Sequence, residues 1–221
     1  MNDNIKIIGK AGALALLSQI PIASAFSTFV NEFVNSKWQE RIELWQKEFI
    51  DRISNLDKKI ERLIKQQKNF ASILATAQQN ALTEFEEEKI PLYVNSVINS
   101  IKSEKIDNTK IHIFINMLKD FTNLHLKVLN FLSNPPKEAW GFNGAVQTEI
   151  FNKPKTILDL FKKENSNIND FSMINIITED LYKKSLITID SLNGNNSFLH
   201  SGKFNKKTTH LGDEFLKFIN N

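Results

Sequence analysis

The residues between Pro21 and Pro91 include neither glycine nor proline. These two residue types usually mark the breaks between secondary-structure elements, so their absence over such a distance favours long helices. Apolar residues within the stretch recur at steps of three or four, which is the period of an amphipathic helix. They are Val34, Trp38, Ile42, Trp45, Phe49, Ile53, Leu56, Ile60 and Leu63. The pattern predicts one helix over about 22–67, roughly 65 Å long.

Such a helix needs a partner to cover its apolar stripe, and the chain supplies one by turning back. The polar segment 65–69 predicts a corner, and a return helix that ends at Glu88 or Lys89 follows. Its apolar face is expected to hold Phe70, Ile73, Leu74, Ala77, Ala81 and Phe85. Pro91 either kinks this helix or begins a new one, where its missing N–H costs nothing. The apolar pattern then continues to about Ser103.

Two further features divide the rest of the chain. Asp107 or Asn108 is expected to cap a helix whose apolar period runs from Ile111 to Leu132. Prolines and glycines then cluster between 133 and 144, which predicts a domain junction. We therefore divide the chain into an apolar N-terminal segment (1–34), a helical hairpin and bundle (35–133), a linker (134–154) and a C-terminal domain (155–221).

The pattern of expected elements in the C-terminal domain differs from that of the hairpin. A short helix is expected over 156–163, and one or two more over 168–185. The β-branched residues at 187–189 predict a strand over 186–190, with a partner strand over 197–204 and a last helix capped by Thr209. This order resembles a winged helix, as do the segments 180–187 and 208–216. The predicted fold is mainly α: a long helical hairpin or bundle followed by a small winged-helix-like α+β domain.

Sequence motifs argue against an enzyme. The chain has no cysteine, which excludes disulfides, thiolate nucleophiles and cysteine-ligated metals. GxxxxGK[ST], GxGxxG, GxSxG and HExxH motifs are absent, and His112 and His125 are too far apart on one predicted helix to share a metal. We therefore predict no catalytic residues, no cofactor and no metal site.

Two charged groups have structural interpretations that we prefer. The glutamates at 84 and 86–88 are expected to form a solvated helix face. The arginines Arg41, Arg52 and Arg62 form a rough stripe on the long helix, with intrahelical partners such as Glu48 and Glu61.

Three kinds of partner stay open. The apolar face of Trp38, Ile42, Trp45, Phe49 and Ile53 is the candidate site for a protein partner or for self-association. Residues 11–31 carry no charge, so the segment 11–34 is the candidate for membrane contact, although Pro21 and several polar residues dilute it. The candidate nucleic-acid contacts are Lys203, Lys206 and Lys207, but a net charge of +3 is a weak basic excess for DNA binding.

Several short phrases resemble the bacterial abortive infection alpha family, whose activity is unknown. They are the proline-containing N-terminal segment, Trp38-Gln39-Glu40-Arg41, Glu87-Glu88-Lys89-Ile90, Leu124-His125-Leu126 and the closing Leu-Gly and Phe-Leu pairs. The resemblance implies a role in phage defence and brings no catalytic residues. We predict a cytoplasmic, non-enzymatic interaction protein that acts by self-association or partner binding. A membrane-acting effector and a DNA-binding regulator are the alternatives.

Overall fold

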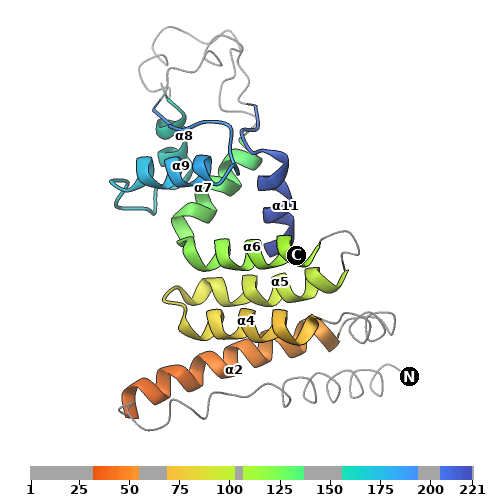
Figure 1. The fold of residues 1–221 in the computed structure, drawn as a ribbon. Coiled ribbons are helices and arrows are strands. Elements are labelled where there is room, and N and C mark those ends of the chain that lie inside the picture. Colours follow the sequence, from red (N-terminus) through yellow and green to blue (C-terminus); the bar gives the residue numbers. More distant parts are fainter. Residues whose placement is uncertain (1–31, 55–68, 103–106, 137–155, 194–204, 221) are drawn as a thin grey trace, which may run out of the picture. The chain divides into compact units, whose positions relative to one another are not determined.

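The computed structural model describes residues 32–54, 69–102, 107–136, 156–193 and 205–220. Across these ranges the chain is mainly helical, as predicted, and no strand is formed. The chain divides into two compact units (Figure 1). The first comprises residues 1–120 together with 218–221, and the second comprises residues 121–217. The chain therefore passes from one unit to the other within the stretch expected to be a single helix, and not at the predicted linker 134–154.

The first unit is a stack of helices that follow one another along the chain (Figure 1). Its elements are α2 (Glu32–Ser54), α4 (Phe70–Thr83), the 3-10 turn η2 (Glu87–Lys89), α5 (Ile90–Lys102) and α6 (Asn108–Asp120). Helix α4 packs against α2, α5 and α6, and α5 also contacts α2 and α6. The predicted hairpin is thus confirmed where it is described, since α4 begins at Phe70. The predicted helix ends near 22 and 67 lie outside the described residues.

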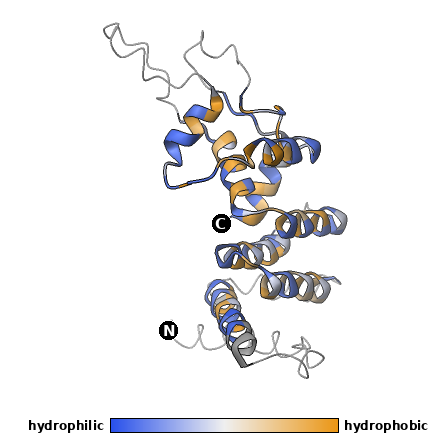
Figure 2. Cartoon of the chain, turned by 90° about the vertical axis from the view of Figure 1, so that its left-hand side faces the viewer, coloured by the Kyte–Doolittle hydropathy of each residue, from blue (hydrophilic) through white to orange (hydrophobic). Residues whose placement is uncertain are grey.

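An apolar core runs through this stack. Figure 2 shows that the helices have an apolar side and a polar side. The Trp45 and Phe49 rings stack with their centroids 6.1 Å apart, and the Phe114 ring lies 5.4 Å from that of Phe218. Asn99 donates through Nδ2 to the carbonyl of Phe218 at 3.0 Å, which satisfies a backbone group near the chain end. Packing and capping together therefore hold residues 218–220 in the first unit.

Local capping sets the helix ends around α5 and α6. Pro91 is the second residue of α5, so it begins a new helix. Asp107 accepts a hydrogen bond from the Lys110 amide at 2.9 Å, which confirms the predicted cap. The helix predicted over 111–132 is wrong as a single element, because the chain breaks between α6 and α7 (Asn123–Ser133). There the Thr122 amide donates to Nδ1 of His125 at 3.1 Å and starts a new helix.

The second unit contains α7, α8 (Ile157–Glu164), α9 (Ile174–Lys183) and most of α11 (His210–Ile219). Its core is aromatic. Phe161 makes edge contacts with Phe131 and Phe171, at centroid distances of 5.2 and 6.1 Å. Phe121 meets Phe215 edge-on at 5.6 Å. These residues come from several elements, so two groups of aromatic rings hold the elements of the unit together.

The predicted winged-helix hairpin is not supported. Among the described residues, Ile187 forms only an isolated antiparallel bridge with Thr208. The backbone pairing is limited to bonds such as Thr188 N to Lys207 O at 2.8 Å. Beyond it the chain turns towards α8, because the Leu192 carbonyl accepts from the Leu158 amide at 3.0 Å. The strand expected over 186–190 is therefore not formed, and the partner expected over 197–204 lies outside the described residues.

Candidate interaction surfaces

The apolar stripe predicted as a partner face is covered within the first unit. Ile42, Trp45, Phe49 and Ile53 are all buried, and α4 and α5 pack against α2. Trp38 falls in α2, but its side chain lies outside the described residues. In this fold the stripe is core, so the four buried residues are not accessible to a partner.

The arginine stripe is structural where it is described. Arg52 forms an ion pair with Glu48 one turn earlier, as predicted, and donates through Nε to Asn95 Oδ1 at 2.7 Å. Arg41 donates through Nη1 to the Leu82 carbonyl at 3.3 Å. These bonds join α2 to α4 and α5. Arg62 and Glu61 lie outside the described residues.

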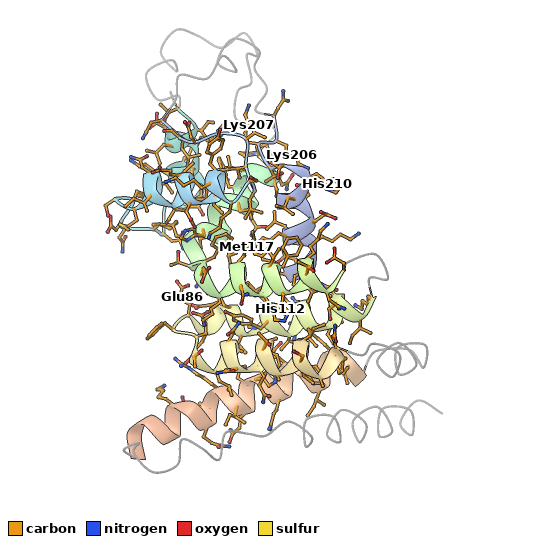
Figure 3. The ribbon with its side chains drawn as sticks, viewed as in Figure 1. Glu86, His112, Met117, Lys206, Lys207 and His210 are labelled. Carbon is orange, nitrogen blue, oxygen red and sulfur yellow. The ribbon has the colours of Figure 1, made fainter. Side chains whose placement is uncertain are left out.

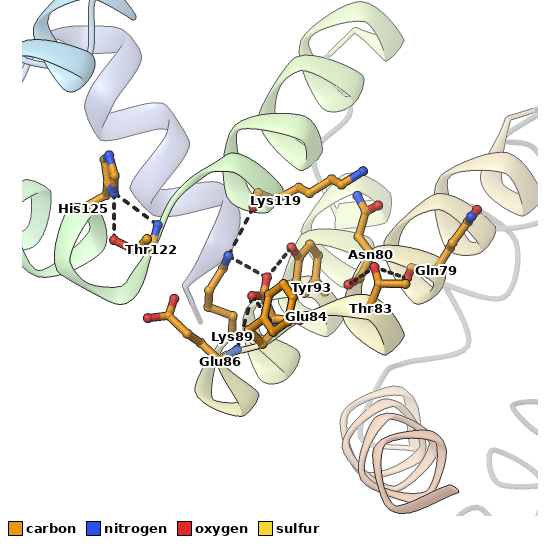
Figure 4. A network of polar contacts seen from close by, with 11 residues as sticks. Gln79, Asn80, Thr83, Glu84, Glu86, Lys89, Tyr93, Lys119, Thr122 and His125 are labelled. Carbon is orange, nitrogen blue, oxygen red and sulfur yellow. Dashed lines mark hydrogen bonds and ion pairs between the residues drawn. The ribbon is translucent and has the colours of Figure 1, made fainter. Parts of the chain in front are cut away.

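A buried polar network replaces the solvated helix face that we expected from the acidic segment. Glu84 follows the last residue of α4 and turns inwards, where its carboxylate lies 2.6 Å from the Nζ of Lys89. The side chains of Glu84 and Lys89 are only 8% and 1% exposed. The Tyr93 hydroxyl donates to Glu84 Oε2 at 3.0 Å, and Lys89 reaches the Lys119 carbonyl at 3.5 Å (Figure 4). The prediction of a solvated face is therefore wrong for Glu84.

The same carboxylate orders the loop that follows it. Glu84 Oε1 accepts from the amides of Phe85 and Glu86, at 2.9 and 3.3 Å. Burial, followed by the charge and hydrogen bond of Glu84, raises the pKa of Tyr93 well above its ordinary value. The Tyr93 hydroxyl therefore stays protonated and remains a donor to the carboxylate. One buried acid thus connects the end of α4, the loop and α5.

Phe85 is the residue that sequence reasoning misplaced. The helical period assigned it to the buried face of the return helix, but α4 ends at Thr83 and the Phe85 side chain is 92% exposed. The signal that could have located it is the segment Glu84-Phe85-Glu86-Glu87-Glu88. A single aromatic residue within a run of acids is an unfavourable continuation of a helix, because neighbouring like charges repel.

Helix α9 of the second unit has one buried face and one exposed face. Ile174, Ile177 and Leu181 are buried, whereas Met173 and Ile176 are 51% and 57% exposed. Thr178 is also buried and donates to the Ile174 carbonyl at 2.7 Å. The start of α9 thus presents two exposed apolar side chains, Met173 at its N-cap and Ile176 in its first turn.

Acids lie next to part of the predicted basic segment. Lys206 forms an ion pair with Asp213, and His210 Nδ1 lies 3.3 Å from Glu214 Oε2. Figure 3 labels Lys206, Lys207 and His210. Burial acts to raise the pKa of Asp213, but hydrogen bonds from the side chains of Lys206 and Thr208 lower it on balance.

This pairing with acids weakens the prediction that the basic segment binds DNA. Asp213 partly neutralises Lys206, and Lys203 lies outside the described residues. The acids Glu179 and Asp180 lie on α9 of the same unit. The described part of the segment therefore lacks the concentrated positive charge that phosphate binding needs.

No cluster of histidines and acids able to hold a metal ion occurs among the described residues. His125 instead stacks on the Phe121 ring and lies 3.6 Å from Asp180. In the parts of the chain that the structure describes, no helix is both long and apolar enough to cross a bilayer. Most of the candidate membrane segment 11–34 lies outside those parts.

Comparisons with known proteins identify no relative. No family model, no curated protein and no solved structure matches the chain. The resemblance to the abortive infection alpha family therefore stays a prediction, and the function has to be argued from the surfaces themselves.

Proposed function

We propose that this protein is a non-enzymatic interaction protein that self-associates through the exposed face of α9. The observation that carries the proposal is the pair Met173, which immediately precedes α9, and Ile176 in its first turn. Both are more than half exposed, whereas the opposite face of the helix is packed. Leaving two large apolar side chains half in water is unfavourable, and covering the exposed half of each gains about 1 kcal/mol. A second copy of the same face would cover both.

The charges on α9 support a symmetric contact between two copies of the same helix. Glu179 and Lys183 form an exposed ion pair at 2.7 Å, one turn apart on the same face. In a twofold contact each surface meets itself, so residues of opposite charge exchange places across the axis. Two antiparallel α9 helices can therefore bring Glu179 of one copy to Lys183 of the other. A face with a single sign of charge would repel its own copy.

The scaffold of the second unit also supports this proposal. Three helices, α7, α8 and α9, precede the isolated bridge between Ile187 and Thr208, and α11 follows it. We infer a winged-helix-like module that uses α9 for protein contact, because its exposed side carries apolar residues and an acid. A role in phage defence is part of the proposal and rests on the sequence resemblance alone.

Light scattering after size-exclusion chromatography tests the proposal. The native chain is expected to show a mass that rises from monomer to dimer with concentration. The double variant M173E/I176E should remain monomeric, because it places like charges face to face. A matched control, I113E, adds a charge at an exposed apolar position of α6 in the first unit and should leave the dimer intact. A native chain that stays monomeric at millimolar concentration refutes the proposal.

A further inference from the structure

Phe85 is presented to solvent by a rigid support. Of the large apolar side chains that the structure describes as exposed, it is the most exposed, at 92%. The Glu84 carboxylate binds the Phe85 amide at 2.9 Å, and the same carboxylate is held by Lys89 at 2.6 Å and by Tyr93 at 3.0 Å. A buried ion pair is costly to assemble. Here it fixes the backbone that carries an exposed aromatic ring.

The rigid support lowers the free-energy cost of using the Phe85 ring in a complex. Binding normally loses free energy when a loop is ordered, and a loop already held in place avoids most of that loss. Aromatic side chains that are presented in this way often contribute a large share of binding energy. An isolated exposed phenylalanine on a loosely held loop has no such advantage. The ordered corner therefore favours an anchor that inserts into a pocket.

The charge around Phe85 indicates what kind of pocket. Glu87 and Glu88 are exposed beside the ring, and Glu86 is partly exposed. The one cation in the segment, Lys89, is buried against Glu84. Lys37 of α2 lies within range of the Glu87 charge, but it is already paired with Glu40. The local surface is therefore acidic on balance, in a chain whose net charge is +3. Complementary charge across an interface steers encounter and excludes wrong partners.

We propose that Phe85 is the anchor of a second interaction surface, and that it inserts into an apolar pocket rimmed by lysine or arginine on a different protein. The acidic corner, defined as residues 84–89, supplies both the ring and the charges that face the rim. This surface belongs to the first unit and is independent of the self-association proposed for α9. Each proposal can therefore fail without the other.

Site-specific photo-crosslinking tests the anchor directly. The full chain carries p-benzoyl-L-phenylalanine at position 85, and the control chain carries it at position 113 on α6, which is also exposed and apolar. After irradiation in the native cell, position 85 should give one discrete adduct to another protein, and position 113 should not. An adduct to a second copy of this chain, to lipid, or equally at both positions overturns the proposal.

Capture alone does not establish the mechanism, so the crosslinked protein is then purified and titrated with the unlabelled chain. F85A should weaken binding at least about tenfold, while its thermal melting curve stays unchanged because the ring is 92% exposed. E87K/E88K should slow association by about tenfold at low salt and lose this effect at high salt. M173E/I176E should bind normally. The inference is overturned if F85A leaves the affinity unchanged, or if binding does not respond to either salt or charge reversal.

Discussion

Replacing Lys89 by methionine tests the buried network from which the acidic corner is built. The change keeps most of the side-chain volume but leaves the Glu84 carboxylate buried without its cation. Removing one partner of a buried ion pair costs about 3–5 kcal/mol. Lys89 and Glu84 are 1% and 8% exposed, so the pair belongs to this buried class.

The remaining contacts set the expected size of the effect. In the variant, Glu84 still accepts hydrogen bonds from Tyr93 and from the amides of Phe85 and Glu86. We therefore expect the loss to fall at the lower end of that range, near about 3 kcal/mol. For a chain of this size each kcal/mol lowers the melting temperature by about 2–4 °C. The K89M variant should consequently melt about 6–12 °C below the native chain.

Urea denaturation measures the loss in free energy of unfolding directly. Circular dichroism reports helix content, and tryptophan fluorescence reports the buried Trp45 in the same unit. A double-mutant cycle with E84Q isolates the pair. Because E84Q/K89M leaves no buried charge, it should be more stable than additivity predicts by about 1–3 kcal/mol. K37M breaks the exposed pair with Glu40 and should show no measurable change. A loss below about 1 kcal/mol for K89M, or strictly additive double-mutant energies, would refute the reasoning.

Three further predictions concern the second unit. A methyl group on Gly212 would lie 2.2 Å from the Leu186 carbonyl oxygen, so G212A should lose about 1–3 kcal/mol in a denaturant titration; a gain, as at an exposed helical glycine, would show that the close approach is absent. Asp213 has a lowered pKa in the folded chain, so its contribution of at most about 1 kcal/mol is present above about pH 4 and is lost as the pH falls. The native chain and D213N should therefore differ in stability at pH 7 and converge in acid, and a difference that persists at pH 2 contradicts this. Thr156 caps α8 by accepting from the Asp159 amide at 3.0 Å, so T156A should cost about 1 kcal/mol in the same titration, and an unchanged midpoint would count against the cap.

The sequence by itself determined the helical character of the described hairpin and several of its boundaries. The apolar period indicated that Ile42, Trp45 and Phe49 share one face, and the structure buries all three. The cap could be narrowed to Asp107 or Asn108, and Pro91 to a helix start or kink, because capping and proline geometry depend on neighbouring residues alone. Such features are local, so they can be predicted without knowledge of the fold.

Two errors show where local reasoning stops. The apolar period continues through the break between α6 and α7, since Phe121 and Leu126 are both buried. The break itself depends on a cap in which His125 takes the place usually held by glutamate or glutamine. The expected strand over 186–190 failed for a different reason, because the chain turns towards α8 soon after the bridge. That turn depends on a contact between residues far apart in the chain.

Only the tertiary structure decided which charged and apolar residues of the acidic corner are buried. By composition, Lys89 and Glu84 belong in water and Phe85 belongs in the core, yet the fold reverses both assignments. The reversal is stable because the lysine and the glutamate neutralise each other and their hydrogen bonds are completed by Tyr93 and the Lys119 carbonyl. Those partners come from α5 and α6, and their approach is set by helix packing. A hydropathy pattern records the preference of each residue for water, but the balance of desolvation against a specific partner exists only once the helices are assembled.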